Sequence, residues 1–195
     1  MAVLAILFAI GVLSLIGFTS RGFLEQNLFR PYWLLPKRQY WTLLSSGFLH
    51  ADLPHLLFNG LTYWFFAPPL QRAIGERRFV TLYFLGLLFS NLGTWIKHHR
   101  QPEYATLGAS GAITAVLFAA IVYFPRNSIV MLPIPVPIPA PLFAVLYLAF
   151  TWVASRRGGG RINHDAHLDG ALTGLAFVAL TDPQAWVRAW HLVMG

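Results

Sequence analysis

The 195-residue sequence contains no cysteine. It therefore has no disulfide framework, no cysteine nucleophile and no thiolate metal site, and its redox compartment stays open. Charge is also scarce, because only 11% of the residues are charged, against about a quarter in an ordinary soluble domain. With a hydrophobic fraction of 56%, this composition indicates an integral membrane protein, which we expect to be a single domain over residues 1–195.

Acidic residues are the scarcer of the two charge types. The chain has 7 Asp and Glu against 14 Lys and Arg, which gives a net charge of +7. The basic residues are scattered through the polar connections and form no long run, so Lys and Arg beside anionic lipid headgroups explain the excess better than nucleic acid does. We expect a lipid bilayer, and no nucleic acid, as a partner.

Apolar segments predict six membrane spans, and no internal repeat is evident. The predicted spans cover residues 1–20, 53–70, 79–96, 108–125, 140–154 and 166–181. The first lacks the basic start and the small-residue cleavage site of a signal peptide, so a retained span is preferred to a cleaved leader. Residues 21–46 mix aromatic and basic side chains, which is typical of the headgroup region. The expected fold class is an all-α membrane protein, a six-transmembrane-helix bundle with a long interfacial first loop.

Proline and aspartate set several predicted boundaries. Pro68-Pro69 is expected to end the second span, and Asp182-Pro183 the sixth. The alternate prolines of residues 133–141 favour an extended chain, so the fifth span can begin only near Ala140. Asp165 is placed to cap the sixth span.

A serine between glycines stands at the start of the fourth span, in Gly108-Ala109-Ser110-Gly111. Hydroxyls in membrane helices usually bond a carbonyl or a neighbouring helix, so the serine alone has a structural explanation. Three other polar residues within or beside apolar segments favour function instead: His55, Asn59 and His167. Spans two, four and six are entered from one side of the membrane, so we expect these side chains near the same surface.

Histidine is the usual base that converts serine into a nucleophile. Gly170 and Gly174 follow His167 at i+3 and i+7, and Gly111 offers a similar smooth surface on the fourth span. Close packing of these two helices would bring Ser110 to His167. The neighbouring Asp165 and Asp169 do not share the helical face of His167, so we expect a dyad without a third member.

Acyl transfer also needs donors for the developing oxyanion. The first N–H groups of the fourth span have no partner within that helix, and His55 and Asn59 lie one turn apart on one helical face. An interhelical structural role is the alternative for either residue taken alone. A metal site at His50, His164 and His167 is disfavoured because no H-E-x-x-H pattern occurs, and we expect neither a metal nor a cofactor. A transporter would show inverted repeats and mid-membrane acids, and we find neither.

From about Gln39 to Gly174 the sequence resembles the rhomboid family of intramembrane serine proteases. The segments that resemble family motifs are residues 50–59 (H-x-x-x-x-H-x-x-x-N), 108–111 (G-x-S-G) and 166–174 (A-H-x-x-G-x-x-x-G). The resemblance implies a six-helix bundle that cleaves peptide bonds in or near transmembrane segments of other membrane proteins. It implies Ser110 as nucleophile, His167 as base, and an oxyanion hole formed by His55, Asn59 and the Ser110 backbone. The alternative is a catalytically silent relative that binds transmembrane helices, and the presence of both dyad residues favours the protease.

Two positions depart from the family pattern. Trp41 is followed by Thr42 rather than by arginine, which bears on how the first loop is anchored. Thr114 stands four residues after Ser110, where the family often has an aromatic residue against the base. The second departure leaves open how His167 is held.

The resemblance implies the plasma membrane of a bacterium, with both termini in the cytoplasm and the active site facing outward. The positive-inside rule disagrees, and the family orientation is preferred because the rule is statistical. The inner side would carry five basic residues (Arg72, Arg77, Arg78, Arg126 and Arg188) and the outer side nine (Arg21, Arg30, Lys37, Arg38, Lys97, Arg100, Arg156, Arg157 and Arg161).

Substrate is expected to enter laterally between the second and fifth spans. The fifth span is short and is followed by Gly158-Gly159-Gly160, so its outer end is expected to move. Phe58 is the predicted bulky gate residue on the second span. The alternative is that Phe58 faces lipid and the first loop lifts instead.

Overall fold

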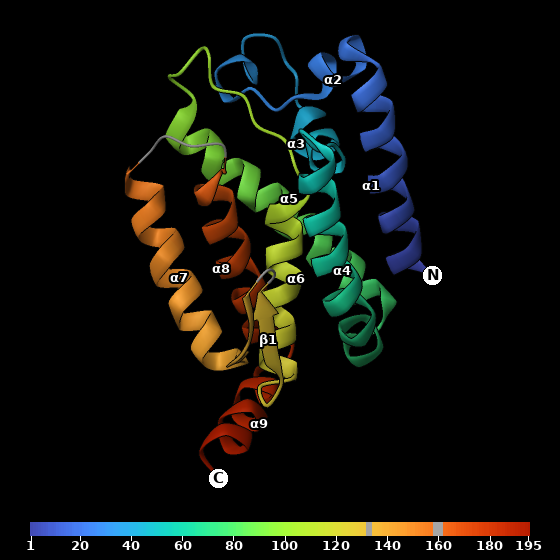
Figure 1. The fold of residues 1–195 in the computed structure, drawn as a ribbon. Coiled ribbons are helices and arrows are strands. Elements are labelled where there is room, and N and C mark those ends of the chain that lie inside the picture. Colours follow the sequence, from blue (N-terminus) through green and yellow to red (C-terminus); the bar gives the residue numbers. More distant parts are fainter. Residues whose placement is uncertain (132–133, 158–161) are drawn as a thin grey trace.

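A computed structural model of the chain describes residues 1–131, 134–157 and 162–195. Its six longest helices lie along the six predicted spans and pack side by side around one of their number, α6 (Figure 1). They are α1 (Ala2–Thr19), α4 (Leu53–Ile74), α5 (Glu76–His98), α6 (Ser110–Tyr123), α7 (Ala140–Arg157) and α8 (His164–Thr181). The first residue of α6 is thus Ser110, which places the serine motif at a helix start.

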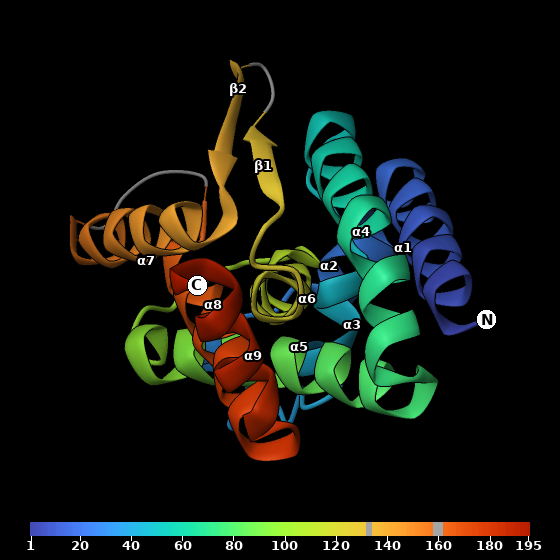
Figure 2. The same cartoon turned by 90° about the horizontal axis from the view of Figure 1, so that it is seen from below.

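Helix α6 is the centre of the bundle. Every residue from Gly111 to Val122 is buried, on all sides of the helix. A helix that is apolar all round has no face suited to water and belongs in a core. Figure 2, seen along the bundle, shows α6 enclosed by α4, α5 and α8. Ser110 therefore begins a helix that other helices surround.

The predicted end of the second span at Pro68-Pro69 is wrong, because α4 continues through both prolines to Ile74. An interior proline removes a backbone hydrogen bond, at a cost of about 3 kcal/mol. The adjacent Ala67 and Leu70 are fully buried, and their packing offsets that cost. The helix ends instead at Gly75, whose φ of 82° suits glycine and few other residues.

The start of α8 also differs from the prediction. Asn163, not Asp165, is the cap, since its side chain accepts a hydrogen bond of 3.0 Å from the Ala166 N–H. Asp165 lies in the first turn and pairs with Lys97 and His98. At the other end, α8 stops at Thr181 as predicted, but α9 (Pro183–Met194) follows, because proline also suits the first turn of a helix.

The chain is not all-α, because the proline-rich segment forms a two-stranded antiparallel sheet of β1 (Ser128–Met131) and β2 (Ile134–Pro139). The prediction of an extended chain before Ala140 is confirmed, and the pairing was not predicted. Ile129 lies opposite Ile138, and Val130 opposite Pro137. Because proline has no backbone N–H, the alternate prolines leave N–H donors only on every second residue. These N–H groups point to the same side of the strand and can all face one partner strand.

The first loop is more structured than the prediction of an interfacial loop implies. It contains α2 (Arg21–Asn27), α3 (Thr42–Ser45) and two 3-10 turns (Pro31–Trp33 and Ser46–Phe48). Phe29 is fully buried and exchanges two backbone hydrogen bonds, of 3.0 and 2.9 Å, with Thr106. The loop is therefore anchored on the connection between α5 and α6, close to where α6 begins.

By length and composition alone, only some of the helices in the bundle are recognisable as membrane spans. Among the described residues, α1 and α5 are the helices long and apolar enough to cross a membrane, and α6 is a shorter apolar helix. Helices α4 and α8 are at least as long as α1. They carry polar residues such as His55, Asn59, His167 and Asp169, which lower their mean hydropathy.

Candidate active site

Helices α6 and α8 cross at very close approach. A Cβ atom added to Gly170 would lie 2.2 Å from the Gly111 carbonyl oxygen. A Cβ atom added to Gly174, one turn further along α8, would lie 2.2 Å from the carbonyl oxygen of Ala115. No side chain fits at either distance, so the two helix backbones touch directly.

This crossing brings together the helix turns that carry Ser110 and His167. A Cβ atom on Gly111, which follows Ser110, would lie 3.3 Å from the carbonyl oxygen of Ala166, which precedes His167. Within the described residues, His167 hydrogen-bonds with Tyr147 rather than with Ser110. The structure thus places the two residues on adjoining turns without a bond between their side chains.

Gly108 lies between Ser110 and His55. Its φ of 129° is unfavourable for other residues, and its N–H donates a hydrogen bond of 3.0 Å to the Ser46 carbonyl. A Cβ atom added there would lie 3.1 Å from His55 Nε2 and 3.8 Å from Ser110 Oγ. The His55 ring and the Ser110 hydroxyl therefore border the same small volume, which the glycine leaves open.

His55 is held at the start of α4 by two contacts. The Asp52 carboxylate caps the helix by accepting a hydrogen bond of 2.8 Å from the His55 N–H. The His55 ring packs edge-on against His50, with ring centroids 4.8 Å apart. Sequence reasoning treated His50 only as a possible metal ligand and as part of the motif, and missed this supporting contact.

His50 also connects the site to α1. Its Nδ1 lies 2.9 Å from the Ser14 hydroxyl, while Nε2 is buried without a hydrogen-bond partner in the described part of the chain. Burial, followed by the nearby His55, lowers the pKa of His50 to about 3, against the opposite effect of Asp52. His50 is therefore neutral at physiological pH, and can support His55 without placing a positive charge beside it.

Asn59 lies one turn after His55 and is buried. Its amide donates a hydrogen bond of 3.0 Å to the His55 carbonyl oxygen, within the same helix. An amide group has two N–H donors, so one remains for another acceptor. Among the described residues, Asn59 makes no hydrogen bond to Ser110.

The base candidate His167 is supported from α7. The Tyr147 hydroxyl lies 3.1 Å from His167 Nδ1, and the two rings are nearly parallel, at 19°. Thr114 lies four residues after Ser110, and its hydroxyl donates a hydrogen bond of 2.7 Å to the Ser110 carbonyl. The aromatic contact to His167 thus comes from another helix, which no spacing within the serine motif could reveal.

The two aspartates near His167 have other contacts. Asp169 points at α5, where a Cβ atom on Gly93 would lie 1.8 Å from its carboxylate. Asp165 accepts hydrogen bonds from Lys97 Nζ at 2.7 Å and from His98 Nε2 at 3.0 Å. Neither carboxylate is the hydrogen-bond partner of His167.

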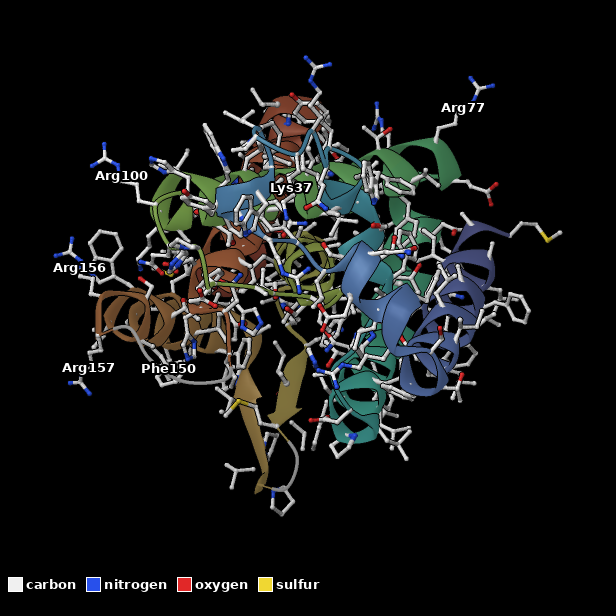
Figure 3. The ribbon with its side chains drawn as sticks, turned by 90° about the horizontal axis from the view of Figure 1, so that it is seen from above. Lys37, Arg77, Arg100, Phe150, Arg156 and Arg157 are labelled. Atoms are coloured by element: carbon white, nitrogen blue, oxygen red, sulfur yellow. The ribbon has the colours of Figure 1, made fainter. Side chains whose placement is uncertain are left out.

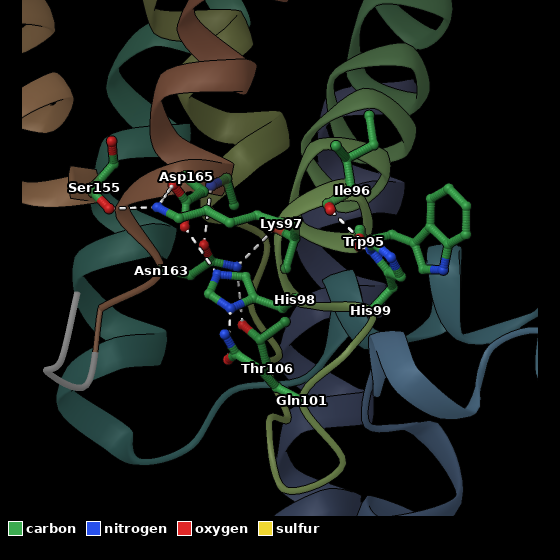
Figure 4. Close-up of polar contacts among 12 residues, drawn as sticks. Trp95, Ile96, Lys97, His98, His99, Gln101, Thr106, Ser155, Asn163 and Asp165 are labelled. Atoms are coloured by element: carbon green, nitrogen blue, oxygen red, sulfur yellow. Dashed lines mark hydrogen bonds and ion pairs between the residues drawn. The ribbon is translucent and has the colours of Figure 1, made fainter.

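A polar group that we call the Lys97 cluster lies beyond the start of α8 (Figure 4). Its members are Lys97, His98, Tyr104, Ser155 and Asp165. Lys97 donates hydrogen bonds both to the Ser155 carbonyl, near the end of α7, and to Asp165 on α8. His98 stacks on Tyr104 at a centroid distance of 3.8 Å, and burial, followed by the Asp165 charge, raises the pKa of Tyr104 to about 12. The cluster joins the ends of α5, α7 and α8.

In the described residues no group of three or more His, Asp or Glu side chains is arranged to hold a metal ion. The groups near the α6–α8 crossing that could take part in a reaction are Ser110, the histidines, Asn59 and the backbone N–H groups.

The chain was compared with known protein families. The Rhomboid domain matches residues 37–183, which is most of the chain. The chain belongs to the rhomboid family, a family of integral membrane proteins.

Individual relatives are more distant and longer. The chain is 28% identical to the rat presenilin-associated rhomboid-like protein, mitochondrial, over 76% of this chain and 42% of that protein. It is 26% identical to the rhomboid protease GluP of Bacillus subtilis, over 78% of this chain and 28% of that protein. A further relative, YdcA of Bacillus subtilis, is 40% identical over 38% of this chain and 37% of that protein. The chain thus spans less than half the length of these curated relatives.

Proposed function

We propose that the protein is an intramembrane serine endopeptidase that cleaves peptide bonds in or near the transmembrane segments of other membrane proteins. The observation that carries the proposal is the glycine crossing of α6 and α8, which puts Ser110 and His167 on adjoining helix turns. Membership of the rhomboid family, in which relatives such as GluP are named as proteases, supports it.

In the proposed reaction, Ser110 Oγ attacks the carbonyl carbon of the scissile bond and gives its proton to His167 Nε2. The bond to the leaving amine then breaks, and the amine takes that proton from His167. Water, activated in turn by His167, hydrolyses the acyl-enzyme and restores the hydroxyl. The chain needs no metal or cofactor for these steps.

The oxyanion formed during attack would be stabilised by donors already near Ser110. The Ser110 backbone N–H is at the first turn of α6 and has no partner within that helix. His55 borders Ser110 across Gly108, and Asn59 has one N–H left beyond its bond to the His55 carbonyl. Donors fixed before the reaction need no reorganisation when charge develops.

The length of α6 supports an active site below the membrane surface. Helix α6 has 14 residues. At 1.5 Å per residue it is roughly 21 Å long, which is shorter than a hydrocarbon core of about 30 Å. Ser110, at its start, would lie inside the membrane at the end toward the Lys97 cluster. We include in the proposal the six membrane spans and the single domain over residues 1–195.

Substrate would reach this site from the lipid between α4 and α7. These helices lie on opposite sides of α6, with the β1–β2 hairpin between them at one end (Figures 1 and 2). Of α7, only Ala140, Phe143 and Thr151 are buried, so it is weakly embedded. Phe58 is 55% exposed on α4, which fits a gate residue and also the alternative that it faces lipid. The glycines of the predicted hinge, residues 158–160, lie outside the described residues.

The proposed function is tested with the purified protein in proteoliposomes that contain a single-span substrate with small residues and helix breakers. We expect the wild type to cleave it, and a fluorophosphonate to label Ser110. Ser110→Ala and His167→Ala should each abolish cleavage with the thermal transition retained. Wild-type protein that binds the substrate segment and never cuts it would instead establish the silent, helix-binding alternative.

The gate is tested separately by joining α4 to α7. A thiol cross-linker applied to the Phe58→Cys, Val153→Cys double variant should block cleavage of the membrane substrate. Labelling of Ser110 by a small soluble fluorophosphonate should persist, because that probe does not need to pass between the helices. The same variant without cross-linker is the control, and unchanged cleavage after cross-linking would exclude this route.

A further inference from the structure

Tyr147 of α7 contacts His167, the proposed base, on α8. The tyrosine hydroxyl lies 3.1 Å from His167 Nδ1, and the ring centroids are 6.4 Å apart. Phe118 of α6 and Phe143 of α7 pack on the tyrosine ring, each at a centroid distance of 5.5 Å. The ring is therefore held by apolar neighbours, while its hydroxyl reaches across to α8.

The direction of this hydrogen bond follows from the role proposed for His167. A tyrosine hydroxyl can either donate or accept. If it donated to Nδ1, the neutral imidazole would carry its hydrogen on Nε2, which could then take no proton from Ser110. A general base at His167 therefore requires that Nδ1 carries the hydrogen and donates it to the tyrosine oxygen.

We propose that Tyr147 is a positioning residue for His167: its hydroxyl, by accepting a hydrogen bond from Nδ1, holds the imidazole in the tautomer with hydrogen on Nδ1 and a bare Nε2. The proposal rests on the proposed function, because only a general base at this position needs a bare Nε2. When the Ser110 Oγ–H bond breaks, the proton moves to Nε2, and the imidazolium keeps its Nδ1–H bond to the tyrosine oxygen. In the opposite tautomer, Nε2 would already carry a hydrogen and could accept none.

The kinetic test is Tyr147→Phe, which keeps the ring and its packing on Phe118 and removes only the hydroxyl. We expect kcat for the membrane substrate to fall about 10-fold with KM unchanged, since one oriented hydrogen bond to the base is lost. The matched control is Tyr83→Phe, because the Tyr83 hydroxyl is buried without a hydrogen-bond partner among the described residues. We expect that control to retain wild-type kcat.

A second measurement does not depend on proteolysis. In ¹⁵N-histidine-labelled protein in micelles, the His167 signals are identified by their loss in His167→Asn. Wild type should show a protonated Nδ1 and a bare Nε2, and Tyr147→Phe a mixture of both tautomers. Hydrogen on Nε2 in the wild type, or a tyrosine variant identical to wild type in tautomer and kcat, would overturn the positioning role. A wild-type protein with the expected tautomer but no proteolysis would refute the proposed function instead.

Discussion

The carbonyl oxygen of Gly111 lies 2.2 Å from the point that a Cβ atom on Gly170 would occupy. Two helices can approach this closely only where one of them has no side chain. One residue before Gly111 is Ser110, and three residues before Gly170 is His167. The separation of the proposed nucleophile and the proposed base is thus set by a contact between two backbones rather than by side-chain packing.

A side chain at position 170 should therefore destroy activity and also weaken the fold. We expect Gly170→Val to lower the free energy of unfolding by about 3 kcal/mol, because the added atoms overpack the crossing. Cleavage should fall below detection even at temperatures where the protein remains folded. Denaturant unfolding together with the proteoliposome assay measures both effects. Gly11→Val on α1, where an added Cβ would meet nothing within 4 Å, is the control. Wild-type cleavage by folded Gly170→Val would show that the crossing does not set the dyad.

The two side-chain donors of the proposed oxyanion hole should affect turnover more than stability. His55→Ala and Asn59→Ala should each lower kcat by about 10- to 1000-fold, the range found when one such donor is removed. Leu57→Ala, at an exposed position on the same helix, should change little. Thermal unfolding of each variant is measured alongside kcat. A rate loss that simply followed the loss of stability in both variants would favour the interhelical structural role.

The Lys97 cluster should restrain the end of α7. Lys97→Met removes the hydrogen bonds to the Ser155 carbonyl and to Asp165, so this end of α7 is freed. We expect cleavage of the membrane substrate to rise about 2- to 5-fold, with a change in stability below about 1 kcal/mol for such an exposed ion pair. Labelling of Ser110 by the small fluorophosphonate should stay at the wild-type rate.

The neighbouring Arg100 supplies the control for that variant. Its side chain points away from the bundle, as do those of Arg156 and Arg157 (Figure 3). Arg100→Met removes the same charge near the same end of α5 and should leave cleavage unchanged. Equal acceleration by both variants would show that net charge, rather than the contact between Lys97 and Ser155, controls entry.

Orientation in the membrane can be measured cleanly because the chain contains no cysteine. We expect Lys37→Cys, in the first loop, to react with an impermeant maleimide on intact cells, and Gly195→Cys to react only after permeabilisation. Both termini would then be inside and the active site outward, against the positive-inside count. Labelling of Gly195→Cys on intact cells would reverse this assignment. Ser110→Ala versions of both variants show that the labelling does not depend on activity.

The sequence by itself determined the helical segments and the residues with reactive side chains. Apolar runs have to be removed from water, so the six long helices lie along the predicted spans. The predicted helix boundaries were less accurate. Pro68 and Pro69 were expected to end α4, but the helix continues through them because the burial of Ala67 and Leu70 offsets the lost backbone hydrogen bonds. The predicted cap of α8 was wrong for a similar reason, because the Asp165 carboxylate pairs with Lys97 and His98 of α5 instead of capping its own helix.

Only the tertiary structure decided how the site is supported. His50 reaches Ser14 from a segment 36 positions away, and Tyr147 reaches His167 from α7. No sequence period or residue spacing predicts such contacts, because they depend on how whole helices pack against one another. The sequence did indicate that Ser110, His55 and His167 belong near one surface, since alternating spans return to the same side of a membrane. Which nitrogen faces which hydroxyl depends on distances of about 3 Å between separate helices, and packing alone sets those distances.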